Sequence, residues 1–168
     1  MRNFYGKQLE ELNQHILEMG QYIEAAIDGA IRALMEKDAE SAKKTIRHDA
    51  KVNHKEKEIE SLCMRLLLSQ QPVATDLRMV SAALKMITDM ERIGDNAADI
   101  SEITLLLIEA GYPSDLSKVK KMAEETIFMV KESVTAYVER DMERAKNVID
   151  HDDVVDGYFS EIDRKSVV

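Results

Sequence analysis

The sequence has very few of the residues that interrupt or cross-link a chain. Its 168 residues include no tryptophan, two prolines, six glycines and one cysteine, and aromatic residues make up 5%. A single cysteine excludes an internal disulfide, which is typical of a reducing compartment. Because helix breakers are rare while Ala, Leu, Met, Glu, Lys and Arg are abundant, the composition predicts an all-α protein.

The sequence also lacks a long apolar segment. Its most apolar run, Leu62 to Leu68, is interrupted by Arg65, and the first residues contain no hydrophobic stretch of the kind found in signal peptides. We therefore expect a cytoplasmic chain that reaches a membrane only indirectly, through partners. The net charge of −9 repels phosphate backbones, so nucleic acid is not an expected partner.

Hydrophobic periodicity and capping residues divide the chain into five long helices. Asp38 and Asp141 are expected N-caps, as is either Ser114 or Asp115, while Pro72 suits a first helical turn and Gly111 a helix end. The predicted helices cover residues 8–36, 38–69, 72–109, 114–139 and 141 to the end.

One stretch of sequence occurs twice. Residues 33–49 read ALMEKDAESAKKTIRHD and residues 136–152 read AYVERDMERAKNVIDHD, with nine of 17 positions identical at an offset of 103. Such a match in one register indicates an internal repeat. We therefore predict a first unit of three helices over residues 1–111 and an incomplete second unit of two helices over 112–168.

The third predicted helix carries acidic residues where apolar residues are expected. The apolar positions Leu77, Val80, Leu84 and Ile87 step by three and four, and the next position in that series is Glu91. Asp95 and Asp99 follow at the same spacing, with Gly94 leaving room beside them. Stacked carboxylates repel one another, so a cation or a basic side chain is expected to neutralise them.

The second helix offers matching oxygen atoms. Asp49 and Asn53 lie one turn apart, and the repeat places Asp152 and Asp156 at the equivalent positions. A site of carboxylate and amide oxygens suits Mg²⁺, Mn²⁺ or iron, and it can also hold Zn²⁺. Two alternatives stay open, because these acidic residues could form a solvated face or be paired with Arg78 and Arg92.

Common catalytic patterns are absent from the sequence. No histidine follows an acidic residue at the Glu-x-x-His spacing of di-iron oxidases, and no phosphate-binding glycine loop or serine–histidine–aspartate motif is recognisable. The repeat-related His48 and His151 are possible ligands but more typical of ordinary helix faces. A regulator is therefore favoured over the alternatives, a metal-dependent hydrolase or oxidase and a purely structural helical spacer.

The segment QPVATDLRMVSAALKMITDMERIGDNAADISE, which contains Asp76-Leu77-Arg78 and Glu91-Arg92-Ile93-Gly94-Asp95, resembles the PhoU family of phosphate-signalling regulators. The resemblance implies two antiparallel three-helix bundles in tandem, each able to hold a multinuclear iron or zinc cluster. It implies no enzymatic step. It also implies that the chain is an adaptor between the ATP-binding subunit of the phosphate ABC transporter and a sensor histidine kinase, acting as a negative regulator at the inner membrane.

The resemblance also suggests which residues bind metal. They are Glu91, Asp95, Asp99, Asp49 and Asn53 in the first unit, and Asp152 and Asp156 in the second. Asn53 departs from the acidic residue usual in the family, which implies weaker binding at the first site.

The counterpart of the third helix is missing from the second unit. Without it, an apolar stripe made of Ile149, Val155, Phe159 and Ile162 is left uncovered. Because exposed stripes of this kind usually associate, we expect a homodimer or higher homo-oligomer. A truncated chain is the alternative explanation.

Overall fold

In a computed structural model, the described residues are 2–68, 74–113 and 115–166, with side chains described for residues 6–68, 74–113 and 115–164. They form five helices and no strand: α1 (Arg2–Glu36), α2 (Ala39–Leu68), α3 (Ala74–Ala110), α4 (Ser117–Glu139) and α5 (Met142–Ser166). The all-α prediction is therefore confirmed. The first helix begins at Arg2, earlier than predicted, and the expected helix start at Pro72 lies outside the described residues.

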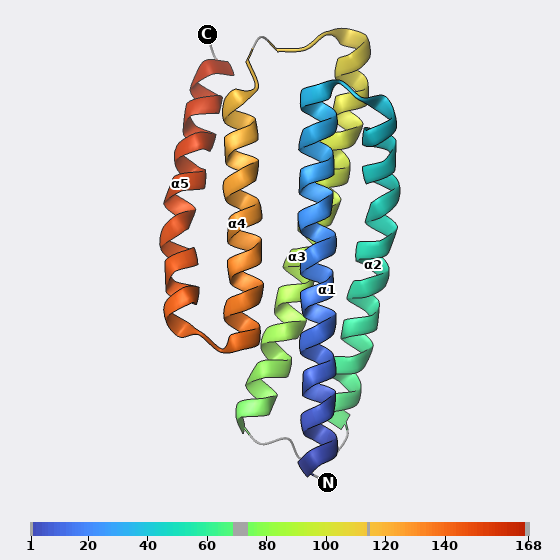
Figure 1. Cartoon of the computed structure of the whole chain (residues 1–168), viewed down its shortest axis with the longest axis vertical. Coiled ribbons are helices and arrows are strands. Elements are labelled where there is room, and N and C mark those ends of the chain that lie inside the picture. Colours follow the sequence, from blue (N-terminus) through green and yellow to red (C-terminus); the bar gives the residue numbers. More distant parts are fainter. Residues whose placement is uncertain (1, 69–73, 114, 167–168) are drawn as a thin grey trace.

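The helices run side by side along the long axis of the molecule (Figure 1). α1, α2 and α3 pack against one another, and α4 packs against α1. α5 packs only against α4 among the described helices and forms the outer edge. No described helix is long and apolar enough to cross a membrane.

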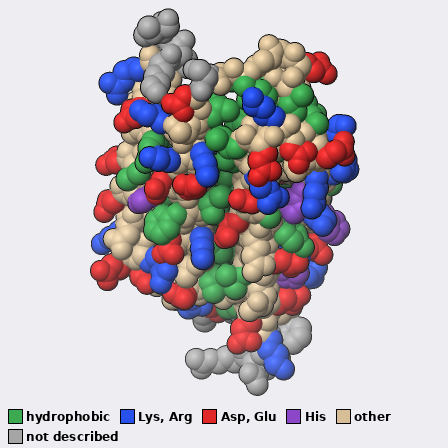
Figure 2. All heavy atoms as spheres, turned by 45° about the horizontal axis from the view of Figure 1, so that its top comes forward, with side chains coloured by type: hydrophobic (Ala, Val, Ile, Leu, Met, Phe, Trp, Pro, Cys, Tyr) green, Lys and Arg blue, Asp and Glu red, His purple; other side chains and the backbone are tan. Residues whose placement is uncertain are grey.

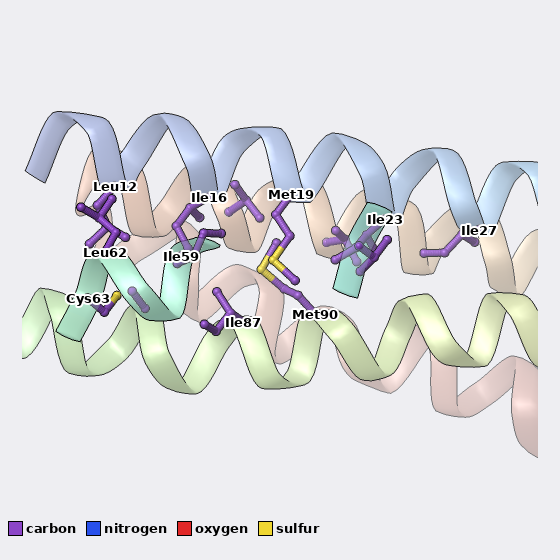
Figure 3. Close-up of a cluster of buried hydrophobic side chains, with 14 of the residues drawn as sticks. Leu12, Ile16, Met19, Ile23, Ile27, Ile59, Leu62, Cys63, Ile87 and Met90 are labelled. Carbon is purple, nitrogen blue, oxygen red and sulfur yellow. The ribbon is translucent and has the colours of Figure 1, made fainter. Parts of the chain in front are cut away.

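The core is built on one face of α1. Leu12, Ile16, Met19 and Ile23 repeat at helical spacing and are fully buried. Figure 3 shows these side chains meeting others from α2 and α3, namely Ile59, Leu62, Cys63, Ile87 and Met90. Each large apolar side chain buried in this way stabilises the fold by about 1.5–3 kcal/mol. Burial raises the pKa of the Cys63 thiol to about 11, so this cysteine is not a reactive thiolate.

The repeat is visible in the backbone of the two helical hairpins. Lys37 and Arg140, 103 residues apart, both adopt left-handed conformations, with φ of 58° and 57°. The residue after each caps the next helix: Asp38 accepts hydrogen bonds from the backbone N–H groups of Glu40 and Ser41, and Asp141 from that of Arg144. Both predicted caps are confirmed, and α1–α2 and α4–α5 are equivalent hairpins.

The predicted cap of the fourth helix is wrong by one or two residues. α4 is capped at Leu116, which makes no side-chain capping bond. Asp115, which precedes the helix, accepts a hydrogen bond on its carboxylate from the N–H of Ser117, the first residue of α4, so it acts in the turn instead. Ser114 lies outside the described residues.

The buried face of α3 agrees only in part with the predicted one. Leu77 is 43% exposed. The buried positions are Val80, Ala83, Ile87, Met90, Gly94, Ala97, Ser101 and Thr104. Val80 and Ile87 are buried as predicted, but some of the other buried positions lie one residue before the predicted ones, so α3 is turned by less than one residue relative to the prediction. Glu91 lies half-buried at the edge of the buried face rather than within it.

Packing joins α4 to the first three helices. Ala123, Val130 and Val134 of α4 belong to the same apolar cluster as the core of α1, α2 and α3. Tyr137 adds a polar link, since its hydroxyl donates to the Met79 carbonyl of α3 at 3.0 Å. The division into units at residues 1–111 and 112–168 stays a prediction.

Candidate metal centre

α2 and α3 approach each other closely at one glycine. A Cβ atom added to Gly94 would lie 2.9 Å from a methyl carbon of Val52, so glycine is required at this crossing. The space beside Gly94 that the sequence suggested for ligands is thus filled by Val52. The close approach nevertheless places Asp49 and Asn53, which flank Val52, opposite Glu91 and Asp95, which flank Gly94.

Four carboxylates gather along this crossing, and we call Asp49, Glu56, Glu91 and Asp95 the α2–α3 carboxylate cluster. Burial raises the pKa of Asp49, and the negative charge of Asp95 raises it further. Burial likewise raises the pKa of Glu91, with added repulsion from Asp95 and Glu56. The two helices therefore hold like charges close together.

The side chain of Glu56 was missed by the sequence analysis. It is half-buried, and burial together with the charges of Glu60 and Asp95 raises its pKa. Glu56 follows Asn53 by three residues and Val52 by four, so helical spacing alone places it on the same face of α2. That spacing was the signal that could have identified it.

Two oxygen atoms of the site have no partner. The Asn53 amide nitrogen donates to Asp49 Oδ2 at 2.9 Å, while Asp49 Oδ1 and Asn53 Oδ1 are buried without a hydrogen bond. Both atoms can only accept, so a cation would satisfy them. In the described part of the chain no three Asp, Glu, His or Cys side chains are close enough together to hold an ion as they stand. Coordination would therefore require these side chains to rotate towards one another.

The arginines suggested as alternative partners do not neutralise the cluster. Arg92 lies 3.8 Å from Asp89 on the exposed side of α3. Arg78 is exposed and makes no ion pair with a described carboxylate. No lysine or arginine in the described part of the chain lies within ion-pair distance of the carboxylate cluster.

The remaining predicted ligands lie apart from the cluster. Asp99 is exposed one turn beyond Asp95. Asp152 and Asp156 are exposed on α5, and no described helix other than α4 packs there. At the first predicted site, the structure therefore brings together the predicted ligands other than Asp99. At the second site it places only the pair Asp152 and Asp156.

The histidines contact the preceding helix in both hairpins. His48 Nε2 lies 2.9 Å from the Tyr22 carbonyl oxygen, and His151 Nε2 lies 2.6 Å from a carboxylate oxygen of Glu125. Tyr22 and Glu125 are themselves 103 residues apart. Both histidines thus serve hairpin packing, as their ordinary helix-face positions suggested.

A buried lysine forms a second charged cluster that the sequence did not reveal. The Lys55 ammonium lies 2.8 Å from Glu18 and 2.7 Å from Glu58, and its side chain is only 8% exposed. Burial alone would lower the pKa of Lys55, but the bonds to the two glutamates outweigh it and raise that pKa. Lys55 is thereby fully paired and ties α2 to α1.

Comparison with known proteins identifies relatives along most of the chain. Residues 16–104 and 119–168 match the PhoU domain family. A phosphate-specific transport system accessory protein PhoU homolog of Aquifex aeolicus is 35% identical over 95% of this chain and 72% of its own length. A homolog of the same description from Clostridium acetobutylicum is 35% identical over 96% of this chain and 74% of its own length.

Solved structures agree with these sequence matches. The crystal structure of PhoU from Pseudomonas aeruginosa has a TM-score of 0.92 at 30% identity, covering 97% of this chain and 78% of that one. The phosphate transport system regulatory protein PhoU from Streptococcus pneumoniae has a TM-score of 0.88 at 28% identity, covering 97% and 77%. On sequence and fold together, the chain belongs to the PhoU family.

Proposed function

We propose that this protein is an accessory regulator of phosphate uptake that acts by binding other proteins rather than by catalysis. The observation that carries the proposal is family membership along almost the whole chain, since the matched relatives are named as phosphate transport accessory or regulatory proteins. Its partners are the ATP-binding subunit of the phosphate ABC transporter and a sensor histidine kinase. It restrains both in phosphate excess, and it works in the cytoplasm at the inner face of the membrane through them.

This proposal is tested by deleting the gene in the source organism and measuring phosphate uptake in phosphate-rich medium. We expect uptake and phosphate-starvation reporter expression to rise, and the full chain supplied in trans to restore them. Unchanged uptake and reporter expression would contradict the regulatory role.

The α2–α3 carboxylate cluster and Asn53 are proposed to bind metal, iron or zinc foremost, with manganese or magnesium as alternatives. The unpartnered oxygens of Asp49 and Asn53 support this, as does the repulsion that raises the pKa values of Asp49 and Glu91. When bound, the metal would supply the positive charge that these carboxylates lack. Asp152 and Asp156 are proposed ligands of a second site.

Elemental analysis of the purified chain tests the metal proposal. We expect the parent chain to contain metal in stoichiometric amount and a Glu91→Gln/Asp95→Asn variant to lose it, while the exposed Glu102→Gln/Glu109→Gln variant on the same helix retains it. A metal-free parent chain after reconstitution, or equal metal in both variants, would refute the assignment.

We also propose that the protein is a homo-oligomer joined through α5. Met142, Ile149 and Phe159 of α5 are 72%, 71% and 62% exposed, whereas Val155 and Ile162 of the predicted stripe are half-buried. Figure 2 shows apolar patches among the charges on the side where α4 and α5 lie. Light scattering at micromolar concentration is expected to give at least a dimer mass, reduced by Ile149→Glu/Phe159→Glu. A monomer in the parent chain would exclude the oligomer.

A further inference from the structure

An open groove lies between α1 and α2 near the turn that joins them. Its volume is about 410 Å³, and its floor is formed where Gly29 of α1 meets Thr45 of α2. A Cβ atom added to Gly29 would lie 2.7 Å from Thr45 Oγ1, so a larger residue at this position would fill the floor. The other lining residues are Ala25, Asp28, Arg32, Ser41, Lys44, Arg47, His48 and Lys51.

The groove is positively charged although the protein as a whole carries a net charge of −9. Arg32, Lys44, Arg47 and Lys51 line it, against the single carboxylate of Asp28. None of the four cations lies within ion-pair distance of a described carboxylate. Figure 2 shows Lys and Arg side chains beside histidines on the right of the molecule, where Figure 1 places α2.

Some other basic side chains of the protein are paired with carboxylates. Lys55 contacts Glu18 and Glu58, and Arg144 contacts Glu132 and Glu139. The four groove cations are exposed, and what sets them apart is that they line one groove together with a single carboxylate. Such a gathering is repulsive unless an anion binds there.

The second hairpin has the same backbone but cannot form this groove. Phe128 occupies the position equivalent to Ala25, and its ring packs on His151 with centroids 4.8 Å apart. Arg144 and Glu132 occupy the positions of Ser41 and Gly29 and form an ion pair at 2.8 Å.

The basic residues are also absent from the second hairpin. Thr135, Asn147, Asp150 and Val154 stand at the positions of Arg32, Lys44, Arg47 and Lys51. The hairpin fold therefore does not by itself produce either the cavity or its charge. The cavity and its positive charge both depend on side chains that only the first hairpin has.

We propose that the α1–α2 groove is a binding site for a phosphate-bearing small anion. Arginine guanidinium groups bind phosphoryl oxygens in pairs, and the lysines add positive charge. A volume of about 410 Å³ falls within the range of small-molecule sites and exceeds what one inorganic phosphate fills. A ligand with two phosphoryl groups, free or esterified, matches the excess of three positive charges over Asp28 in the lining.

Isothermal titration calorimetry on the full chain, treated with chelator to remove any metal from the carboxylate cluster, tests the site. The probes are inorganic phosphate, pyrophosphate and ADP, with acetate as a monovalent comparison. We expect pyrophosphate or ADP to bind more tightly than phosphate, and the affinity to fall as salt is raised. Preference for pyrophosphate indicates a free anion, and preference for ADP indicates an ester.

Two variants separate the groove from non-specific charge. Ala25→Phe fills the cavity without changing the charge, and Lys44→Gln/Lys51→Gln removes charge without filling it. Each is expected to weaken binding at least about tenfold. Ala25→Phe does so by occupying the space of the anion, and Lys44→Gln/Lys51→Gln because each charge-assisted contact contributes on the order of one factor of ten. The charge-matched variant Lys131→Gln/Lys146→Gln in the second hairpin is expected to bind like the parent. Binding by none of the probes, or binding unaffected by both groove variants, would overturn the proposal.

Discussion

Single residues at the α2–α3 crossing link stability to metal and pH. The pKa of Asp49 is raised above its ordinary value of 3.8, so the folded chain binds its proton more tightly than the unfolded chain does. The resulting penalty is absent below that ordinary value and grows as pH rises through the raised one. A metal-free chain is therefore expected to lose stability in this window as the carboxylate ionises.

The substitution Asp49→Asn tests this linkage. In the metal-free chain at neutral pH we expect it to raise the free energy of unfolding by about 0.5 kcal/mol, the scale of like-charge pairs on helices. The gain should shrink towards pH 4, and it should become a loss when metal is bound, because a ligand is then removed. Urea unfolding with chelator and with metal measures the change in the free energy of unfolding in both states. A gain in stability that is unaffected by metal would count against Asp49 as a ligand.

Lys55 stabilises the fold because it lies between opposite charges, whereas Asp49 lies among like charges. Its bonds to Glu18 and Glu58 lower the pKa values of both glutamates below their ordinary 4.5, so the stabilisation is present above that value and is lost as pH falls through the lowered values. Lys55→Met keeps the buried stem but removes the charge. We expect it to cost about 1–2 kcal/mol at neutral pH, less than a fully buried pair, because both glutamates are partly exposed to water.

The pH dependence provides the control for Lys55. The difference in unfolding free energy between Lys55→Met and the parent chain should diminish in acid, where the glutamates are protonated. Equal destabilisation at neutral and acid pH would show that lost packing, and not the ion pairs, explains the effect.

At the scale of helices, the α2–α3 contact depends on Gly94. Gly94→Ala would place a methyl group against Val52, and we expect it to reduce the free energy of unfolding by about 1–3 kcal/mol. Gly157→Ala is the control, because nothing lies within 4 Å of its added Cβ, and there alanine should stabilise the helix by up to about 1 kcal/mol. Thermal unfolding compares the two.

A second change distinguishes a local clash from other effects of Gly94→Ala. Adding Val52→Ala removes the contacted methyl groups, so the double variant should be less destabilised than the sum of the two single ones. Additive losses would mean that the contact between Gly94 and Val52 does not set the helix spacing.

The helices and the turns between them were predictable because their signals are local. Asp38 and Asp141 act on backbone groups two or three residues away, and Gly111 ends α3 with a φ of 107°. The buried face of α3 was not predictable in detail, since its rotation depends on how Val52 of α2 fits against Gly94. Asp49 and Glu91, which the sequence analysis proposed as ligands of one site, lie near each other and near Asp95. Glu56 was overlooked. The basic groove could not be predicted from the sequence. Its lining comes from two helices, and its four basic residues do not stand out in a sequence that is acidic overall.

At the scale of the whole molecule, the helices differ in how firmly they are held. α1 contacts α2, α3 and α4, whereas α5 contacts only α4 and buries only Val148 among its described side chains. Hydrogen exchange read by mass spectrometry is therefore expected to show faster exchange in α5 than in α1 or α2. Ile149→Glu/Phe159→Glu should accelerate it further if another copy covers α5. Protection of α5 equal to that of α1 in a monomer would contradict this order.

The left-handed residues Lys37 and Arg140 have a consequence for how the chain can be rebuilt. Because the two turns have the same backbone conformation, side chains of the first hairpin can be introduced into the second. The offset of 103 residues gives the equivalent position for each of them. Adding 103 to each groove position leaves His151 unchanged and specifies the other substitutions as Phe128→Ala, Lys131→Asp, Glu132→Gly, Thr135→Arg, Arg144→Ser, Asn147→Lys, Val148→Thr, Asp150→Arg and Val154→Lys. The two hairpins therefore share one backbone design, and only the first carries the side chains that form the basic groove.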